Sequence, residues 1–198
     1  MPRLVLASAS PARRTTLRAA GLDPTVIVSG VDESQLADLP PAELALQLAE
    51  LKCAAVAGGD VVPAEALVLG CDSVLELDGD ALGKPRDAEE ARLRWQAMRG
   101  RSGVLHTGHC LRDVASDRVA AATASTTVHF ADVSDAEIDA YVATGEPLHV
   151  AGAFTIDGLG GAFVTGIEGD HHNVVGVSLP LLRELVLELG HEWPDLWA

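Results

Sequence analysis

The stretch Leu4-Val5-Leu6-Ala7-Ser8-Ala9-Ser10-Pro11-Ala12-Arg13-Arg14 joins an apolar run to hydroxyl and cationic side chains. Residues 4–7 have the length and apolarity of a short strand. Ser10 suits a helix N-cap, Pro11 suits the first helical position, and Gly21 marks the end of that helix. The stretch therefore predicts a strand-to-helix turn.

Two arginines fall in the first turn of this predicted helix, where positive charge is unfavourable. The helix dipole there opposes a cation by about 0.3–1 kcal/mol. A bound polyphosphate reverses the penalty, because free N–H groups, the hydroxyls of Ser8 and Ser10, and the guanidinium groups of Arg13 and Arg14 then meet one anion. The alternative is an ordinary capped surface helix with solvated arginines.

Size and composition indicate one packed globular protein. The chain has 198 residues, of which 48% are hydrophobic, so we expect a single domain over residues 1–198. No apolar run approaches the length of a signal-peptide core or a membrane span, so we expect a cytoplasmic protein. The three cysteines, Cys53, Cys71 and Cys110, are odd in number and lack CxxC spacing, which predicts reduced and mostly buried thiols.

The net charge of −15 argues against nucleic-acid duplexes and anionic membranes as partners. A polyanionic small molecule requires a local cluster of cations. Only Lys52 and Lys84 among the fourteen basic residues are lysines. Lysine is a compact point charge that suits a phosphate oxygen in a tight site. The alternative for Lys52 is a solvated charge on a helix face.

Alternating strand and helix patterns predict an elongated α/β fold with a mixed sheet and a cleft. A long helix opens at Pro40-Pro41, stops at Gly58-Gly59, and is predicted to bury Leu44, Leu48, Leu51 and Ala55. We treat His171-His172 as part of a surface loop. The other helices are predicted at 87–98, 134–145 and 180–189, and strands at 25–29, 66–71, 74–77, 81–82, 104–112, 118–130, 153–156 and 162–167. Asp87 with Glu90 and Ser134 with Glu137 resemble capping boxes at the starts of the first two helices. The Asp78-Gly79 turn indicates a hairpin, and residues 104–130 suggest a second, antiparallel ribbon.

Two carboxylates, Glu33 and Asp72, follow strand-like runs. Hydrolysis of a phosphoanhydride needs a divalent cation and a base that activates water, and carboxylate oxygens suit Mg²⁺ or Mn²⁺. The alternative is that both simply cap turns. Gly83-Lys84-Pro85 is not a Walker A loop, because the spacing from Gly79 is too short and proline replaces the metal-binding hydroxyl.

A series of short motifs, spread in order over nearly the whole chain, resembles the Maf family of nucleotide pyrophosphatases. They include Ser8-x-Ser10-Pro11-x-Arg13-Arg14, Val31-Asp32-Glu33, Lys52-x-Ala54, Gly70-x-Asp72, Gly83-Lys84-Pro85, Thr107-Gly108, Gly145-Glu146-Pro147, Ala151-Gly152-Ala153-Phe154 and Asn173-x-x-Gly176.

The resemblance implies a two-lobed α/β fold with a central cleft, similar to that of inosine triphosphate pyrophosphatases, and often a homodimer. It implies hydrolysis of a nucleoside triphosphate to the monophosphate and pyrophosphate with Mg²⁺ or Mn²⁺, in the removal of non-standard nucleotides. Asp72 matches the catalytic base, and Glu33 with Asp72 the metal-binding carboxylates. Ser8, Arg13, Lys52 and Lys84 match the polar set around the triphosphate, and both lysines count with Asp72 as catalytic residues. Ser10 and Arg14, in the same motif as Ser8 and Arg13, are further expected substrate-binding residues.

The resemblance also bears on which nucleobase the substrate carries. The branch that acts on dTTP and UTP has a glutamine where this chain has Asp157, whereas the branch that acts on 7-methyl-GTP has an acidic residue followed by Gly-Leu-Gly, as in Gly158-Leu159-Gly160. A carboxylate accepts hydrogen bonds but cannot donate them, so Asp157 suits the N–H edge of guanine and opposes the carbonyls of uracil. The alternative is that Asp157 caps a turn.

Other functions stay open at this point. They are a preference for dTTP and UTP, a non-catalytic nucleotide-binding regulator of cell division, and a phosphatase that releases the γ-phosphate. The presence of Asp72, Glu33 and both lysines argues against the regulator, because a sensor needs no carboxylate that activates water.

Overall fold

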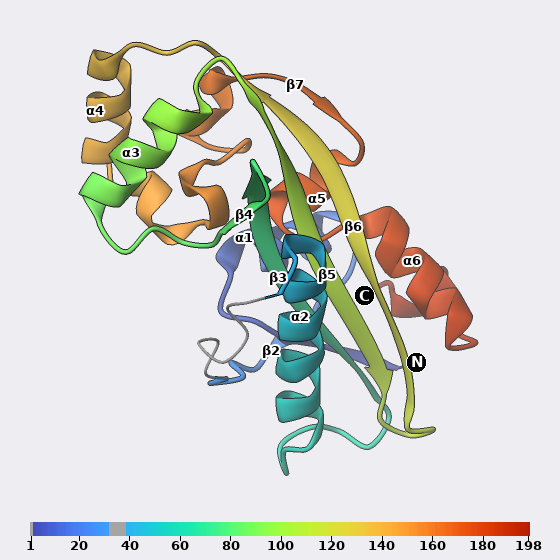
Figure 1. The fold of residues 1–198 in the computed structure, drawn as a ribbon. Coiled ribbons are helices and arrows are strands. Elements are labelled where there is room, and N and C mark those ends of the chain that lie inside the picture. Colours follow the sequence, from blue (N-terminus) through green and yellow to red (C-terminus); the bar gives the residue numbers. More distant parts are fainter. Residues whose placement is uncertain (1, 32–38) are drawn as a thin grey trace.

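The computed structural model describes residues 2–31 and 39–198. A mixed sheet with strand order β2-β1-β3-β5-β6-β7, in which β4 also pairs with β3, forms the centre of the molecule (Figure 1). The strands are β1 (Arg3–Ala7), β2 (Thr25–Val26), β3 (Ala66–Leu77), β4 (Asp80–Leu82), β5 (Ser102–Asp113), β6 (Arg118–Phe130) and β7 (Val164–Glu168). The α-helices are α1 (Pro11–Ala19), α2 (Pro41–Ala57), α3 (Ala88–Met98), α4 (Asp135–Ala143), α5 (His171–Val175) and α6 (Leu179–Glu188). Short 3₁₀ helices cover Glu146–His149, Ala151–Ala153, Leu159–Phe163 and Trp193–Leu196.

The sheet has a break along one side of β3. On that side, β1 pairs in parallel with β3 as far as Gly70, and β4 pairs with β3 only from Leu75 onward. On the other side, β5 pairs with β3 without interruption from Leu67 to Glu76. Asp72 and Ser73 therefore lie in a strand segment that is fixed by β5 but has no strand neighbour opposite it among the described residues.

Helix α2 lies unusually close to the sheet because two glycines face it. A Cβ atom on Gly70 would lie 2.2 Å from the carbonyl oxygen of Ala49, and one on Gly108 would lie 2.1 Å from that of Ala45. The buried residues of α2 at and beside these close contacts are small, namely Ala45, Ala49 and Cys53, and the helix also buries Pro41, Leu48 and Val56. The predicted buried face was wrong for Leu51, which is 42% exposed, and for Ala55.

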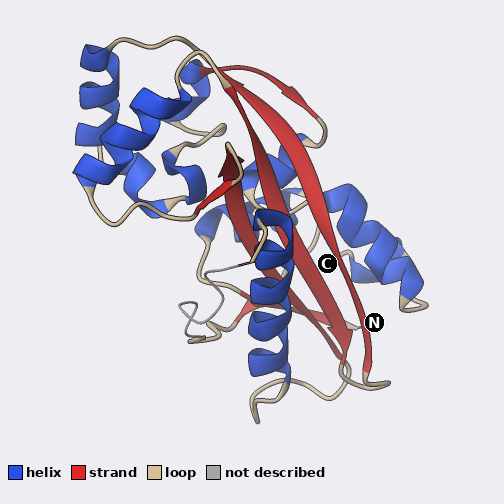
Figure 2. Cartoon of the chain, viewed as in Figure 1, coloured by secondary structure: helices blue, strands red, loops and turns tan. Residues whose placement is uncertain are grey.

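Three apolar clusters divide the molecule. Two lie on opposite faces of the lower sheet, one beneath α1 and α6 and one beneath α2. The third forms a separate upper lobe from α3, α4 and the 3₁₀ segments (Figures 1 and 2). This lobe packs around the C-terminal ends of β3 and β6 and the N-terminal end of β5. Its centre is the buried Trp95, which packs edge-on against Phe130, Tyr141 and Phe163. The predicted mixed α/β fold is confirmed.

Several predicted elements differ from the observed ones. Residues 66–71 and 74–77 belong to the single strand β3, so Asp72 lies inside a strand and not at a strand end. The continuous pairing with β5 explains this. The strand predicted at 25–29 has only two residues, and that predicted at 162–167 begins later, at Val164.

Two local predictions were wrong. Residues 153–156 do not form a strand, because Gly152 and Ala153 adopt positive φ angles of 68° and 59° within a 3₁₀ turn. The segment around His171-His172 is the short helix α5 and not a loop. Asp170 caps its start by accepting a hydrogen bond from the His172 N–H, and Gly176 ends it with a φ of 117°.

The elements with strong local signals are confirmed. Ser10 caps α1, Asp87 caps α3, and Ser134 with Glu137 forms a capping box for α4. The hairpin of β3 with β4 and the long ribbon of β5 with β6 are also present. All three cysteines are free and buried, as predicted. Within the described ranges, no helix has both the length and the apolarity that crossing a membrane requires.

Candidate active site

An ion pair between Asp72 and Lys52 stands at the break in the sheet. The Lys52 Nζ lies 2.5 Å from Asp72 Oδ1, and the two side chains are 12% and 14% exposed. The close seating of α2 on Gly70 and Gly108 brings Lys52 over β3. The ammonium group orients the carboxylate and balances its charge, while the carboxylate can accept a proton from a nearby water molecule.

Arg13 is buried and binds three separate parts of the chain. Its Nε donates to the Gly176 carbonyl at 2.7 Å, and its two terminal nitrogens donate to Ser8 Oγ and Ser73 Oγ, each at 3.0 Å. Ser8 Oγ also accepts the Ser10 N–H at 3.2 Å. Arg13 therefore joins the turn after β1 to the segment of β3 at the break in the sheet and to the turn after α5.

The network continues through buried polar groups across the sheet. Ser73 and Thr107 are joined through their hydroxyls at 2.9 Å, and Thr107 donates to the carbonyl of Asn173 at 3.3 Å. The fully buried Asn173 amide donates to the Leu105 carbonyl and to Thr126 Oγ1, each at 3.1 Å. These bonds fix α5 against the face of the sheet on which Arg13 lies.

His109 anchors the same region. Its Nδ1 lies 2.9 Å from the Thr107 carbonyl, and its Nε2 accepts the Ser178 N–H at 2.8 Å. Burial is the main cause that lowers the pKa of His109 to about 4. A neutral imidazole with its proton on Nδ1 satisfies both contacts at neutral pH.

Two predicted cations lie on the surface. Lys84 is exposed directly after the hairpin, and the carbonyl of its neighbour Gly83 accepts hydrogen bonds from Arg94 at 2.5 Å and from the Gly152 N–H at 3.1 Å. These bonds fix the backbone before Lys84. Arg14 is exposed and lines a shallow depression of about 290 Å³ at the start of α1.

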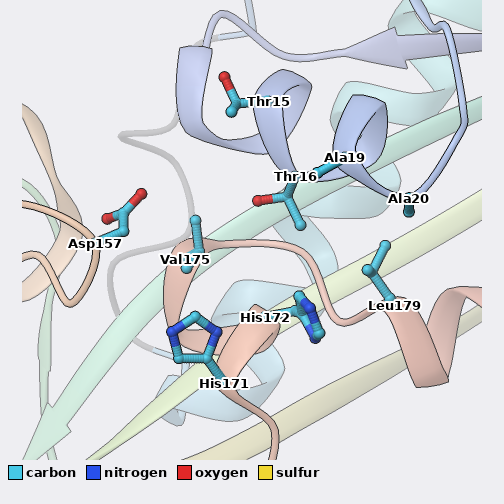
Figure 3. Close-up of a pocket in the computed structure, with 9 residues that line it drawn as sticks. All are labelled: Thr15, Thr16, Ala19, Ala20, Asp157, His171, His172, Val175 and Leu179. Atoms are coloured by element: carbon cyan, nitrogen blue, oxygen red, sulfur yellow. The ribbon is translucent and has the colours of Figure 1, made fainter.

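A cavity of about 260 Å³ lies between α1 and α5. Its walls are Thr15, Thr16, Ala19, Ala20, Asp157, His171, His172, Val175 and Leu179. Asp157 is the one carboxylate among these lining residues, and it enters from a loop that belongs to neither helix (Figure 3). The cavity thus combines apolar walls, two imidazoles and a single anionic acceptor.

The predicted metal ligands are divided. Asp72 offers a carboxylate oxygen, which suits Mg²⁺ or Mn²⁺. Glu33 lies outside the described residues. Among residues 2–31 and 39–198, no three His, Cys, Asp or Glu side chains gather in a group that would hold a metal ion. Metal binding by Glu33 and Asp72 stays a prediction.

The structure thus brings some of the predicted residues together and separates others. Asp72 pairs with Lys52, and Ser8 and Ser10 lie together with Arg13. Lys84, Arg14 and Asp157 belong to neither group and are exposed. Sequence reasoning gave no role to Ser73, Thr107, Asn173, His109 or Glu146, although all but Ser73 and His109 lie within the quoted motifs.

The comparisons with known proteins identify the family. The model for "Maf-like protein" matches residues 3–189 of this chain. A protein of Streptomyces avermitilis is 64% identical over 99% of this chain and 95% of its own length, and one of Gloeothece citriformis is 52% identical over 98% and 97%. Both are named nucleoside triphosphate pyrophosphatase. The chain belongs to the Maf family, so the resemblance to this family is confirmed, while the preference for the 7-methyl-GTP branch stays a prediction.

A solved structure, that of the Staphylococcus aureus Ham1 protein, aligns with 66% of this chain and 72% of that chain. The TM-score is 0.45 and the sequence identity is 17%.

Proposed function

We propose that this protein hydrolyses a nucleoside triphosphate to the nucleoside monophosphate and pyrophosphate. The observation that carries the proposal is the partly buried pair of Asp72 and Lys52, which stands in the break of the sheet close to the hydroxyl-rich turn after β1. The names of the Maf relatives support the same reaction.

In this reaction Asp72 is the base. It takes a proton from a water molecule whose oxygen attacks the α-phosphorus, and the bond from that phosphorus to the bridging oxygen breaks, which releases pyrophosphate. Lys52 holds the Asp72 carboxylate in place. Lys84 and the N–H groups at the start of α1 meet the negative charge of the phosphates. Asp72 and Glu33 would hold a divalent cation, which would supply further neutralisation of that charge.

Arg13 has a supporting role in this arrangement. Its hydrogen bonds join Ser8, which follows β1, to Ser73 at the break in the sheet. Three of its five N–H groups are used within the protein, which leaves two for phosphate oxygens.

We place the nucleobase of the substrate in the cavity between α1 and α5. The cavity of about 260 Å³ lies just below the range of about 300–1,000 Å³ that is typical of drug-sized ligands, which suits a nucleobase. Five residues of α1, or roughly 8 Å, separate Ser10 from Thr15 at the cavity wall. Because the Asp157 carboxylate can only accept hydrogen bonds, it favours guanine over uracil. The positive charge of 7-methylguanine would strengthen its attraction to this carboxylate further.

The products of a nucleotide panel test the proposed reaction. The protein is incubated with GTP, 7-methyl-GTP, dTTP and UTP in the presence of Mg²⁺ or Mn²⁺, and the products are identified by mass spectrometry. Monophosphate with pyrophosphate supports the proposal. Diphosphate with orthophosphate indicates a γ-phosphatase, and the absence of turnover indicates a binding protein that regulates cell division.

Replacement of Asp72 tests its assignment as the catalytic base. We expect Asp72→Asn to lower kcat by about 10²–10⁴-fold while nucleotide binding is retained. The matched control is Asp78→Asn, because Asp78 lies on the exposed turn after β3 and pairs with Arg101. A wild-type rate in Asp72→Asn refutes the assignment. A homodimer, a cytoplasmic location, a role in the removal of non-standard nucleotides, and the absence of nucleic-acid and membrane partners stay predictions.

A further inference from the structure

Glu146 is a partly buried carboxylate that gathers four hydrogen bonds in the upper lobe. It accepts from the Thr155 hydroxyl at 2.5 Å and from the Tyr141 hydroxyl at 3.1 Å. It also accepts the backbone N–H groups of Leu159 and Gly160, both at 3.1 Å. A charged acceptor with this many donors is a strong local constraint.

These donors lie on both sides of Asp157. Thr155 precedes Asp157 by two residues, and Leu159 and Gly160 follow it by two and three. One carboxylate therefore closes the loop that carries Asp157. Within the part of the chain that the structure describes, the Asp157 side chain has no hydrogen-bond partner of its own, so the backbone on either side determines where it lies.

The loop fits closely around its anchor. A Cβ atom on Gly158 would lie 2.8 Å from the Glu146 carboxylate oxygens, and one on Gly160 would lie 2.4 Å from the Tyr141 hydroxyl oxygen. Tyr141 is 3% exposed and packs edge-on against Trp95 and Phe163. The anchor is thus attached to the buried aromatic core of the upper lobe.

Glu146 is charged at neutral pH. Burial alone raises the pKa of such a carboxyl group, but the hydrogen bonds from Thr155, Leu159 and Gly160 outweigh burial and hold the pKa below its ordinary value. The loop is consequently bound by a full negative charge over the whole physiological range.

We propose that Glu146 is a positioning residue for base selection, which acts by holding Asp157 at the mouth of the cavity between α1 and α5. This inference rests on the proposed function, because it requires that Asp157 meets the base. Glu146 is not itself among the residues that line the cavity. A loop that is fixed before binding loses less entropy on binding and discriminates more sharply between bases.

The experiment compares Glu146→Gln, Asp157→Ala and the double variant. The first readout is the ratio of kcat/KM for GTP to that for UTP, and the second is amide hydrogen exchange of the peptide that covers residues 155–161. The control is Glu137→Gln, which removes a carboxylate from the capping box of α4 in the same lobe but not from the loop.

We expect Glu146→Gln to lower the GTP-to-UTP ratio at least tenfold, with the loss greater in KM than in kcat, and to speed exchange at Leu159 and Gly160. The double variant should match Asp157→Ala alone, since Glu146 acts only through Asp157. Glu137→Gln should leave the ratio and the loop exchange unchanged.

Three results overturn the inference. Unchanged exchange in Glu146→Gln shows that the carboxylate does not hold the loop. An unchanged ratio in Glu146→Gln, with an altered one in Asp157→Ala, shows that the loop does not need its anchor. An unchanged ratio in Asp157→Ala shows that the proposed base contact itself is wrong, and the exchange data then still tell whether Glu146 holds the loop.

Discussion

Replacement of Gly108 by alanine places a methyl group where α2 lies on the sheet. The new Cβ would lie 2.1 Å from the Ala45 carbonyl oxygen, whereas ordinary contact begins at 3.4 Å, so α2 must move away by more than 1 Å. Overpacking of this kind costs about 1–3 kcal/mol. For a chain of this size that corresponds to a fall in Tm of roughly 2–12 °C.

The same displacement acts on the proposed chemistry, because α2 carries Lys52. A shift of about 1 Å in a positioning group costs on the order of 10²-fold in rate. We therefore expect Gly108→Ala to lower both Tm and kcat, with the fall in kcat remaining at temperatures well below Tm. The assays are thermal unfolding and steady-state release of pyrophosphate.

A matched control is Gly58→Ala at the end of the same helix, where a Cβ meets its nearest atom at an ordinary 3.5 Å. That variant should keep wild-type Tm and activity. If Gly108→Ala retains full activity, the reasoning that the close approach of α2 places Lys52 on Asp72 is refuted.

Three further predictions follow from the polar groups around the site. The pKa of His109 is lowered to about 4 from 6.5, so the unfolded state binds the proton more readily than the folded state. The free energy of unfolding should therefore fall by up to about 3 kcal/mol as the pH decreases from 6.5 to 4. Urea unfolding at several pH values measures this fall, and the same pH dependence of stability in His109→Gln would contradict the prediction. Arg13→Lys should lower the free energy of unfolding by about 1.5–3 kcal/mol, because one ammonium group cannot reach Ser8, Ser73 and Gly176 together. An unchanged urea midpoint in this variant would refute the prediction. Lys84→Ala should raise KM for the triphosphate without a change in Tm, since Lys84 is exposed; an unchanged KM would remove Lys84 from the proposed phosphate site.

The sequence predicts those elements whose signals are local. Ser10 before Pro11, the Asp78-Gly79 turn and the Ser134 with Glu137 pair each satisfy backbone groups within a few residues, and all three are present. The buried face of α2 was mispredicted because it depends on Gly70 and Gly108, which are distant in sequence.

The candidate site shows the same limit. Charge at the start of α1 pointed to an anion, but periodicity carries no information on the partners of Arg13, which come from β3 and from the turn after α5. The pairing of Lys52 with Asp72 likewise depends on how α2 crosses the sheet. The family resemblance placed both in one site, and the structure gives the contact between them.

The most direct test of the proposed reaction is hydrolysis in water labelled with ¹⁸O, followed by mass spectrometry of both products. Attack of water on the α-phosphorus predicts one ¹⁸O atom in the nucleoside monophosphate and none in the pyrophosphate, with incorporation lost in Asp72→Asn. Label in pyrophosphate or in orthophosphate would contradict the proposed reaction.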